Sequence, residues 1–394
     1  MTVLSEGTRH AHVSMFNNPK IRSIVVQVLF VLLLLWAGYE IVANTSENLA
    51  RLGKKINFSF LQSTSGFDII QSLISYSRES SYGRAILVGL LNTILVAGLG
   101  ILFATIIGFL VGVMRLSSNW VVRKIATLYV ELVRNIPLLL QIFFWYAAVL
   151  KPLPGPKQSL SLLDFFFLNN RGLIMPKPIW GAGAEIVGFA VIAGIVAAFF
   201  VNRWAVKRQE ATGEQFPRLL AAIGLIIGLP ILVFIATGAP VTFEYPELKG
   251  FNFVGGITLI PEFLALLVAI SVYTASFIAE IVRAGILAVS HGQTEAANAL
   301  GLRSGPTLRL VVIPQALRVI IPPLTSQYLN LTKNSSLAVA IAYPDLVAMG
   351  GTVNNQSGQA IEVFVIWMVV YLTLSLITSM LMNWYNARVR LVER

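Results

Sequence analysis

The chain has 394 residues, of which 56% are hydrophobic and only 12% are charged. This charged share is about half that of a soluble domain. The composition therefore excludes an ordinary globular enzyme and indicates an integral membrane protein. The formal net charge of +11 does not require a nucleic-acid partner, because cytoplasmic loops of membrane proteins collect Lys and Arg. No cysteine is present, so disulfides and thiolate chemistry are excluded.

Eight apolar stretches are long enough to cross a bilayer as helices, which takes about 20 residues. They occupy residues 23–42, 85–114, 125–150, 186–201, 219–238, 257–286, 310–331 and 362–384. The first stretch is long for a signal peptide and no small-x-small cleavage site follows it, so an uncleaved helix is favoured. Residues 44–84, 151–184 and 239–256 are interpreted as outer loops, with a short amphipathic helix near 67–76.

Several spans carry residues that constrain their packing. Gly108 and Gly112 have the small-x-x-x-small spacing that lets membrane helices approach closely. Glu131 and Arg134 share one helical face and can pair, or else snorkel toward the cytoplasmic surface. Three prolines, at positions 314, 322 and 323, are expected to interrupt the seventh span, which requires neighbours or a cavity to satisfy the freed backbone groups.

The distribution of basic residues predicts the orientation. An even number of spans puts both termini on one side. With that side cytoplasmic, the inner segments hold 17 of the 29 lysines and arginines, and the outer loops hold ten. This bias agrees with the positive-inside rule, so the loop between the sixth and seventh spans is expected to face the cytoplasm.

That loop has the pattern of a peg for a soluble partner. Its coupling residues are Gly292, Thr294, Glu295, Ala296, Ala297, Leu300, Gly301 and Leu302. Glu, Ala and Leu favour a short helix, and Gly301 is the expected helix stop. An ordinary amphipathic loop helix is the alternative interpretation.

At these residues the sequence resembles the "EAA" loop of ATP-binding-cassette (ABC) importer permeases. Glu295-Ala296-Ala297, Gly301 and Ile313-Pro314 stand at that family's spacing. There the loop forms a coupling helix that fits a groove on a cytoplasmic ATPase. Further stretches at 129–139, 279–286 and 314–323 are similar to the polar-amino-acid uptake branch, as is the Lys-x-(Thr/Ser)-Ser pattern at 333–336.

Two departures from the usual five-helix core of that branch resemble the general L-amino acid permease subunits of Gram-negative bacteria. They are the extra helices and the sequence Arg-Asn-Ile-Pro at 134–137, in place of Arg-Gly-Thr-Pro. The resemblance implies an all-α, polytopic, inner-membrane protein with about eight transmembrane helices and the type I ABC importer permease fold. Its expected parts are an N-terminal tail, extra helix and periplasmic segment (1–84), the first part of the core (85–150), an insertion with two helices (151–256), and the second part of the core (257–394), which contains the coupling loop at about 292–314.

The chain has no Gly-x-x-x-x-Gly-Lys-(Ser/Thr) phosphate loop, so it must borrow ATP energy. The resemblance implies a cytoplasmic ATP-binding subunit dimer, a paralogous second permease subunit, a periplasmic amino-acid-binding protein and membrane lipid as partners. No catalytic residue, metal or cofactor is expected, and the three histidines, at positions 10, 12 and 291, are interpreted as solvated.

A zwitterionic substrate needs an anion for its ammonium group and donors for its carboxylate. The candidate pathway residues are Glu131, Arg134, Glu280, Arg283, Asn330, Lys333, Ser335 and Ser336. A structural ion pair with a helix-end cap is the alternative role for the last six of them.

Other function classes fit the sequence less well. Intramembrane charges also suit a secondary transporter or a channel for small polar solutes, but no convincing inverted repeat is present and such a carrier has no use for a coupling peg. An intramembrane enzyme would need a Gly-x-Ser-x-Gly or His-Glu-x-x-His motif, and neither occurs. A scaffold subunit that lines no route stays open.

Overall fold

The computed structural model describes residues 19–51 and 56–389 of the chain. It is mainly helical, which confirms the predicted class. The long helices are α1 (Pro19–Arg51), α2 (Tyr82–Met114), α3 (Trp120–Asn135), α5 (Ala184–Thr212), α8 (Pro261–Leu287), α11 (Ile313–Asn334) and α13 (Ala360–Val389). The shorter ones are α4 (Leu138–Phe143), α6 (Arg218–Ile223), α7 (Leu229–Ala236), α9 (His291–Ala299), α10 (Ser304–Thr307) and α12 (Leu346–Ser357).

Short π-helical and 3₁₀ segments extend or join these helices. The π segments are η3 (Phe144–Leu150), η5 (Gly224–Gly228) and η6 (Leu308–Val312), and the 3₁₀ segments are η2 (Phe58–Gln62), η4 (Pro156–Gln158) and η7 (Ser335–Ile341). Because η5 joins α6 to α7, residues 218–236 form one span. Within the described residues, seven helices are long and apolar enough to cross a membrane, and a bent pair brings the number to eight. The predicted number of about eight spans is therefore confirmed.

The third predicted span is not one straight helix. The α3 helix ends at Asn135, and α4 with η3 continues at an angle of 105° to it. Pro137 stands at the break, where it cannot donate a backbone hydrogen bond. The side chain of Gln141 donates to the carbonyls of Val133 and Ile136, both at 2.9 Å, so the backbone groups freed by the bend are satisfied within the chain.

The prolines of the seventh span were predicted to interrupt it, and this was wrong. The α11 helix runs continuously through Pro322 and Pro323. Pro314 lies in its first turn, where a missing N–H costs little. The irregular backbone lies just before the helix, in the π segment η6.

The core is built around α8, which packs against α2, α3, α4 and α11. The small-residue spacing on α2 serves this contact. A Cβ added at Gly108 would lie 2.6 Å from Cβ of Ile278, and one added at Gly112 would lie 2.7 Å from Cβ of Val282. Only glycine lets the two backbones approach this closely, as the spacing predicts.

The outer loops contain strands that were not predicted. One sheet has the order β1 (Leu160–Leu162), β2 (Phe166–Asn169), β3 (Gly172–Met175) and β8 (Ile257–Leu259), all antiparallel. Two further ladders pair β4 (Lys177–Trp180) with β5 (Val241–Glu244), and β6 (Glu247–Lys249) with β7 (Asn252–Val254). Because residues 257–259 pair with β3, the sixth helix begins at Pro261 rather than at the predicted residue 257.

The predicted helix at 67–76 is absent. This segment is an irregular loop in which the hydroxyls of Ser65 and Tyr76 lie 2.7 Å apart and the guanidinium of Arg84 donates to the carbonyl of Ser75. These side-chain contacts replace the helical hydrogen bonds that the apolar spacing suggested.

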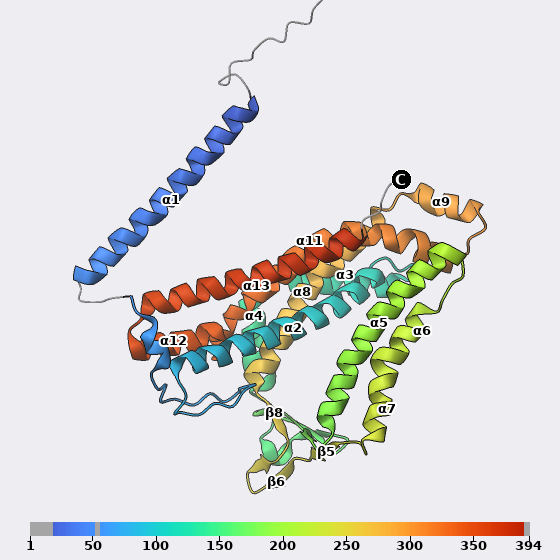
Figure 1. Ribbon diagram of the computed structural model, residues 1–394. Helices are drawn as coiled ribbons and strands as arrows, with labels where there is room; N and C mark the ends of the chain where they lie inside the picture. The colour runs from blue at the N-terminus through green and yellow to red at the C-terminus, as the bar shows by residue number, and fades with distance from the viewer. Residues whose placement is uncertain (1–18, 52–55, 390–394) are drawn as a thin grey trace, which may run out of the picture.

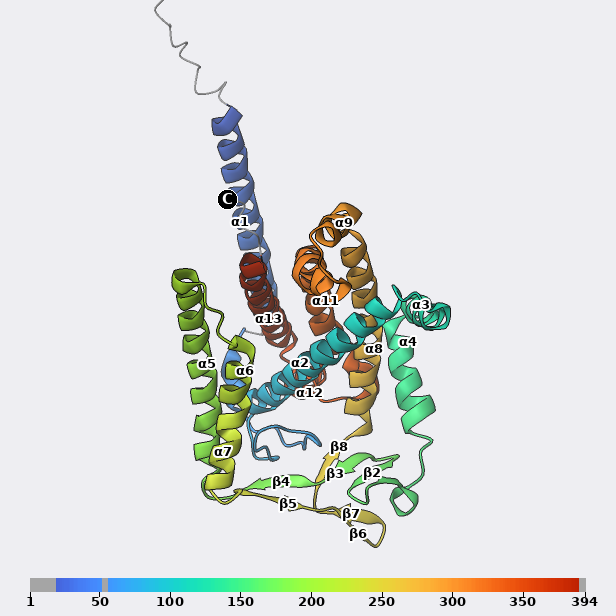
Figure 2. The same ribbon diagram turned by 90° about the vertical axis from the view of Figure 1, so that its right-hand side faces the viewer.

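The two ends of the helix bundle differ. Figures 1 and 2 show the β layer at one end, below α7 and α8, and show α9 and the C-terminal end of α5 at the other. The hairpin of α5 with α6–α7 stands beside the core, and α1 stands apart from both. The end that carries α9 is called the α9 end below.

Candidate coupling helix and transport pathway

The predicted peg is a separate helix, α9 (His291–Ala299), held between α8 and α10. Its end has the geometry of a Schellman cap. The N–H of Leu302 donates to the carbonyl of Ala297 at 3.1 Å, and the N–H of Gly301 donates to the carbonyl of Asn298 at 2.9 Å. Gly301 has φ of 75°, a left-handed conformation that glycine adopts without strain. The predicted stop at Gly301 is therefore confirmed.

The peg has one side toward the protein and one side free. Ala297 is buried, Thr294 is half-buried, and Glu295, Ala296 and Leu300 are exposed. Leu300 is 81% exposed. The carboxylate of Glu295 lies 2.9 Å from Nδ1 of exposed His291, and both face outward.

Gly292, the first of the predicted coupling residues, has an ordinary helical backbone. It lies inside α9, exposed, and among the described residues it is not one of those with positive φ. Its neighbour Gln293 accepts a hydrogen bond from the side chain of Gln315 at 3.1 Å, which ties the first turn of α9 to the first turn of α11.

The helices on either side of the peg pack tightly against each other. A side chain at Gly285, in the last turn of α8, would overlap Ile320 of α11. Ala316 and Ile320 are buried in the same contact. Closely packed helices transmit a displacement rather than absorbing it, so a pull on α9 acts on α8 and α11 together.

Glu280 and Arg283 lie at the α9 end of the core, in an ion cluster with a third residue. The carboxylate of Glu280 accepts from the guanidinium of Arg283 at 2.5 Å and also from Arg115, the residue that follows α2. The cluster joins the ends of α2 and α8. No local sequence signal marks Arg115, because it lies 165 residues before its partner.

The other candidate residues lie near the middle of the core. A Cβ at Gly100, halfway along α2, would lie 3.2 Å from Leu331 and 3.3 Å from Ile270, so these three residues share one level. Lys333 follows Leu331 by two positions. The hydroxyl of Ser335 donates to the carbonyl of Thr332 and that of Ser336 to the carbonyl of Lys333, both at 2.7 Å.

The structure therefore separates the two sets of candidates. Glu280 follows Ile270 on α8 by ten residues, which corresponds to about 15 Å along a helix. An amino acid spans far less than that. The ion cluster and the group around Lys333 cannot hold the two ends of one substrate at the same time.

Lys333 and Asn330 are exposed on α11, and no ion pair involves Lys333 among the residues that the structure describes. A lysine at the middle height of a membrane protein is costly when it faces lipid, so such side chains normally face water or another protein chain. Asn330 and Lys333 thus form a polar, exposed stretch of α11.

Glu131 and Arg134 make no ion pair with each other. The guanidinium of Arg134 instead lies 4.9 Å from the ring centroid of Phe277 on α8, a cation–π contact between the bent third span and the core. Both charged residues are exposed, as is Asn135, whose side chain donates to the carbonyl of Glu131 at 2.8 Å.

A buried polar group beyond the core was not predicted. Asp345 precedes α12, and its Oδ1 accepts the N–H of Ala348 at 2.8 Å as a helix cap. The side chain of Asn92 donates to the carbonyl of Pro344 at 2.9 Å, and the N–H of Leu346 donates to Thr93 at 3.0 Å. Burial raises the pKa of Asp345 to about 7. This group fixes α12 to the outer half of α2.

Comparison with known proteins agrees with this architecture. Residues 216–391 match the family model described as "Binding-protein-dependent transport system inner membrane component". The general L-amino acid transport system permease protein AapQ of Rhizobium johnstonii is 56% identical over 98% of this chain and 97% of its own length. The putative amino-acid ABC transporter permease protein YhdX of Escherichia coli is 52% identical, over 96% and 97%.

A third relative, the glutamate/glutamine/aspartate/asparagine transport system permease protein BztB of Rhodobacter capsulatus, is 44% identical over 96% of each chain. The fold and the peg thus define a membrane component of a binding-protein-dependent transport system. Within that class, the chain belongs to the family of amino-acid ABC transporter permeases.

Proposed function

We propose that this chain carries L-amino acids inward across the inner membrane as one permease subunit of a complex, driven by ATP that a separate cytoplasmic ATPase dimer hydrolyses. In this proposal the α9 end and both termini face the cytoplasm, and the β layer faces the periplasm. The bias of basic residues and the names of the relatives support this orientation and this substrate class.

The observation that carries the proposal is the peg itself. A capped helix with an exposed leucine and an exposed carboxylate lies at the α9 end, and the helices α8 and α11 that flank it in the chain pack closely against each other. A partner that binds α9 differently in outward- and inward-open states would shift the equilibrium between them. A carrier that works alone has no use for such a surface.

A second permease chain completes the proposed route. Lys333 and Asn330 are polar and exposed at the middle height of the core, where a lipid-facing position is unfavourable. With a paralogous subunit opposite, these side chains and Ser336 line an aqueous path, and the lysine is available to a substrate carboxylate. The periplasmic amino-acid-binding protein then delivers the substrate at the end that carries the β layer.

Substitution of Glu295 tests the coupling. Glu295→Lys reverses a charge on the exposed face of α9, and we expect substrate-stimulated ATPase activity and uptake to fall about tenfold or more, since a charged hydrogen bond contributes about 1.5–3 kcal/mol. Both are measured in proteoliposomes that contain the complete complex and the binding protein.

Glu79→Lys is the matched control, because it makes the same charge change at an exposed position of the other end. It should insert and assemble like Glu295→Lys but retain coupling. Normal stimulated ATPase activity in Glu295→Lys would refute the role of α9. Uptake that persists in vesicles without the ATPase would favour a secondary transporter.

A further inference from the structure

The α9 end holds a cavity between the inserted hairpin and the segment that follows the peg. It has a volume of about 640 Å³ and is lined from two sides. The turn between α5 and α6 supplies Gln209, Gln215, Phe216 and Arg218, and the α10–η6 segment supplies Gly305, Pro306, Arg309 and Leu310. Parts of the chain about 90 residues apart thus form one polar pocket.

The pocket has the chemistry of an anion site. Arg218 of α6 and Arg309 of η6 both line it, so two positively charged side chains from different parts of the chain are available to an anion bound there. Arg218 donates to the side chain of Gln209 at 3.1 Å, and Arg309 has no acidic partner among the ion pairs of the described residues. Glu214, in the turn between α5 and α6, is bound by Arg208 at 2.6 Å.

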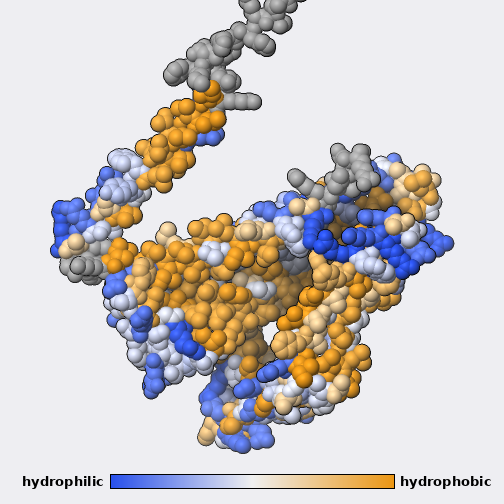
Figure 3. All heavy atoms as spheres, viewed as in Figure 1, coloured by the Kyte–Doolittle hydropathy of each residue, from blue (hydrophilic) through white to orange (hydrophobic). Residues whose placement is uncertain are grey.

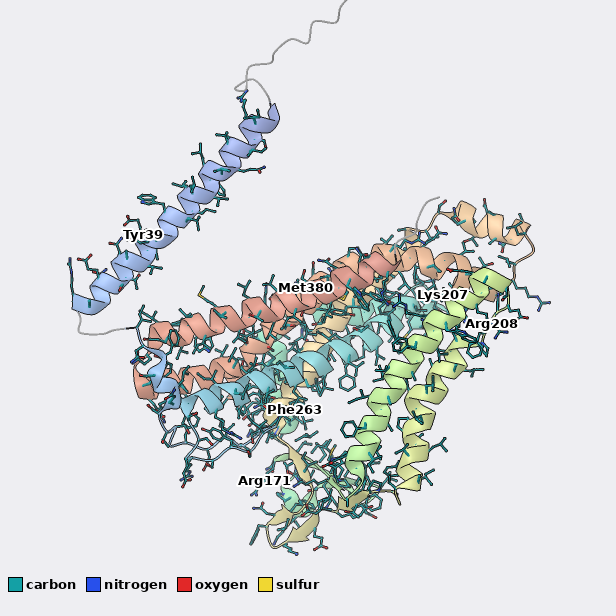
Figure 4. The ribbon with its side chains drawn as sticks, viewed as in Figure 1. Tyr39, Arg171, Lys207, Arg208, Phe263 and Met380 are labelled. Atoms are coloured by element: carbon teal, nitrogen blue, oxygen red, sulfur yellow. The ribbon has the colours of Figure 1, made fainter. Side chains whose placement is uncertain are left out.

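Neighbouring aromatic residues place this pocket at the level of lipid headgroups. Trp204 and Phe216 pack edge to face with ring centroids 5.5 Å apart, and Trp204 remains 50% exposed. Arg208 lies over the Trp204 ring at 5.4 Å. Exposed tryptophan beside basic residues at the end of a spanning helix is the pattern of the membrane–water interface. Figure 4 shows Lys207 and Arg208 on the last turns of α5.

The surface below the pocket is suited to acyl chains. Figure 3 shows a hydrophilic band across the α9 end, with hydrophobic surface directly beneath it on both the hairpin and the core. Phe200, Leu219 and Leu310 are exposed beneath or beside the two arginines. A soluble anion would leave this adjoining apolar surface uncovered, whereas the acyl chains of a phospholipid would cover it.

We propose that this pocket binds the headgroup of an anionic phospholipid of the cytoplasmic leaflet, with the phosphate between Arg218 and Arg309. The inference rests on the proposed function only in naming this side cytoplasmic. A bound lipid bridges the inserted hairpin to the segment that follows the peg. The insertion then serves as a lipid-held support for the coupling loop.

The test uses the complete complex in nanodiscs and a phosphatidylglycerol that carries a photoreactive group next to its headgroup. After illumination, labelled peptides are mapped by mass spectrometry. We expect labels in residues 204–219 and 305–310, with competition by unlabelled phosphatidylglycerol but not by equal phosphatidylcholine or by millimolar inorganic phosphate. Basic residues near an anionic surface each change binding about fivefold, so the double variant Arg218→Ala/Arg309→Ala should reduce labelling more than tenfold.

Arg203→Ala is the matched control, because Arg203 is exposed on the same end of α5, contacts Phe199 at 5.6 Å and does not line the pocket. Because Arg203 does not line the pocket, this variant should keep clearly more labelling than the double variant. Equal thermal melting of the variants shows that the fold is retained. Unchanged labelling in the double variant overturns the proposal. Competition by inorganic phosphate would point to a free anion and would also overturn the lipid proposal. Protection of these peptides by the ATPase alone would point to a protein contact, with the same consequence.

Discussion

The close contact between α2 and α8 at Gly112 can be tested with one methyl group. In Gly112→Ala the new Cβ would lie 2.7 Å from Cβ of Val282 and 2.8 Å from the carbonyl oxygen of Ala279, where ordinary contacts begin at 3.4 Å. The helices must therefore separate by about 0.7 Å at this point. Because the obstructing atoms are backbone and Cβ, no rotamer change relieves the overlap.

The cost of this overlap is separable from the helix propensity of alanine. Overpacking in a core typically costs about 1–3 kcal/mol, whereas alanine in place of glycine gains up to about 1 kcal/mol in a helix interior. Gly98 is the matched control, since it lies on the same helix and an added Cβ meets nothing within 4 Å. The difference between Gly112→Ala and Gly98→Ala isolates the contact.

We expect Gly112→Ala to melt a few degrees below Gly98→Ala when both complexes are purified in the same detergent and followed by intrinsic fluorescence. Coupling should fall as well, because Gly112 lies one turn before Arg115, which binds Glu280. Equal melting temperatures would show that α2 and α8 are not in the contact described, and would refute the argument that their close packing transmits force.

Two further predictions concern the caps of α9 and α12. Gly301→Val forces a branched side chain into a backbone with φ of 75°, which costs about 1–2 kcal/mol. The amide hydrogens of peptide 291–302 should therefore exchange faster in this variant than in the control Gly292→Ala, where φ is ordinary. Equal exchange in the two variants would contradict the cap at Gly301. Burial raises the pKa of Asp345 from 3.8 to about 7, so between these pH values the folded protein keeps a proton that the unfolded chain has lost. The free energy of unfolding should therefore fall by about 2–4 kcal/mol as the pH rises from 4 to 7. Asp345→Asn retains a helix cap, and its melting temperature should depend less on pH. An unchanged pH dependence would show that Asp345 is not the group that titrates.

The sequence predicted those features that depend on local composition. Apolar runs marked the spans, the spacing of Gly108 and Gly112 marked a close contact, and Gly301 marked the end of the peg, because each signal lies within a few neighbouring residues. The continuous helix through Pro322 and Pro323 was missed, because a proline signal does not show whether neighbouring helices support the backbone.

The remaining errors come from long-range contacts. The partners of β3 in β8 are about 83 residues further along the chain, so neither strand shows a local sign of its pairing. The same holds for Arg115 with Glu280 and for Arg134 with Phe277. The sequence singled out Glu280 and Lys333 as candidate pathway residues, but it could not show that they stand at different depths. The roles proposed for them in transport stay predictions.

The strand pairing at the outer end has an evolutionary consequence. Met175 and Ile257 are partners in the β3–β8 ladder, so the 81 residues between them leave and rejoin the core at adjacent points. Such a segment can vary as one unit. Residues 176–256 could therefore change in length while the paths of α4 and α8 stayed as they are.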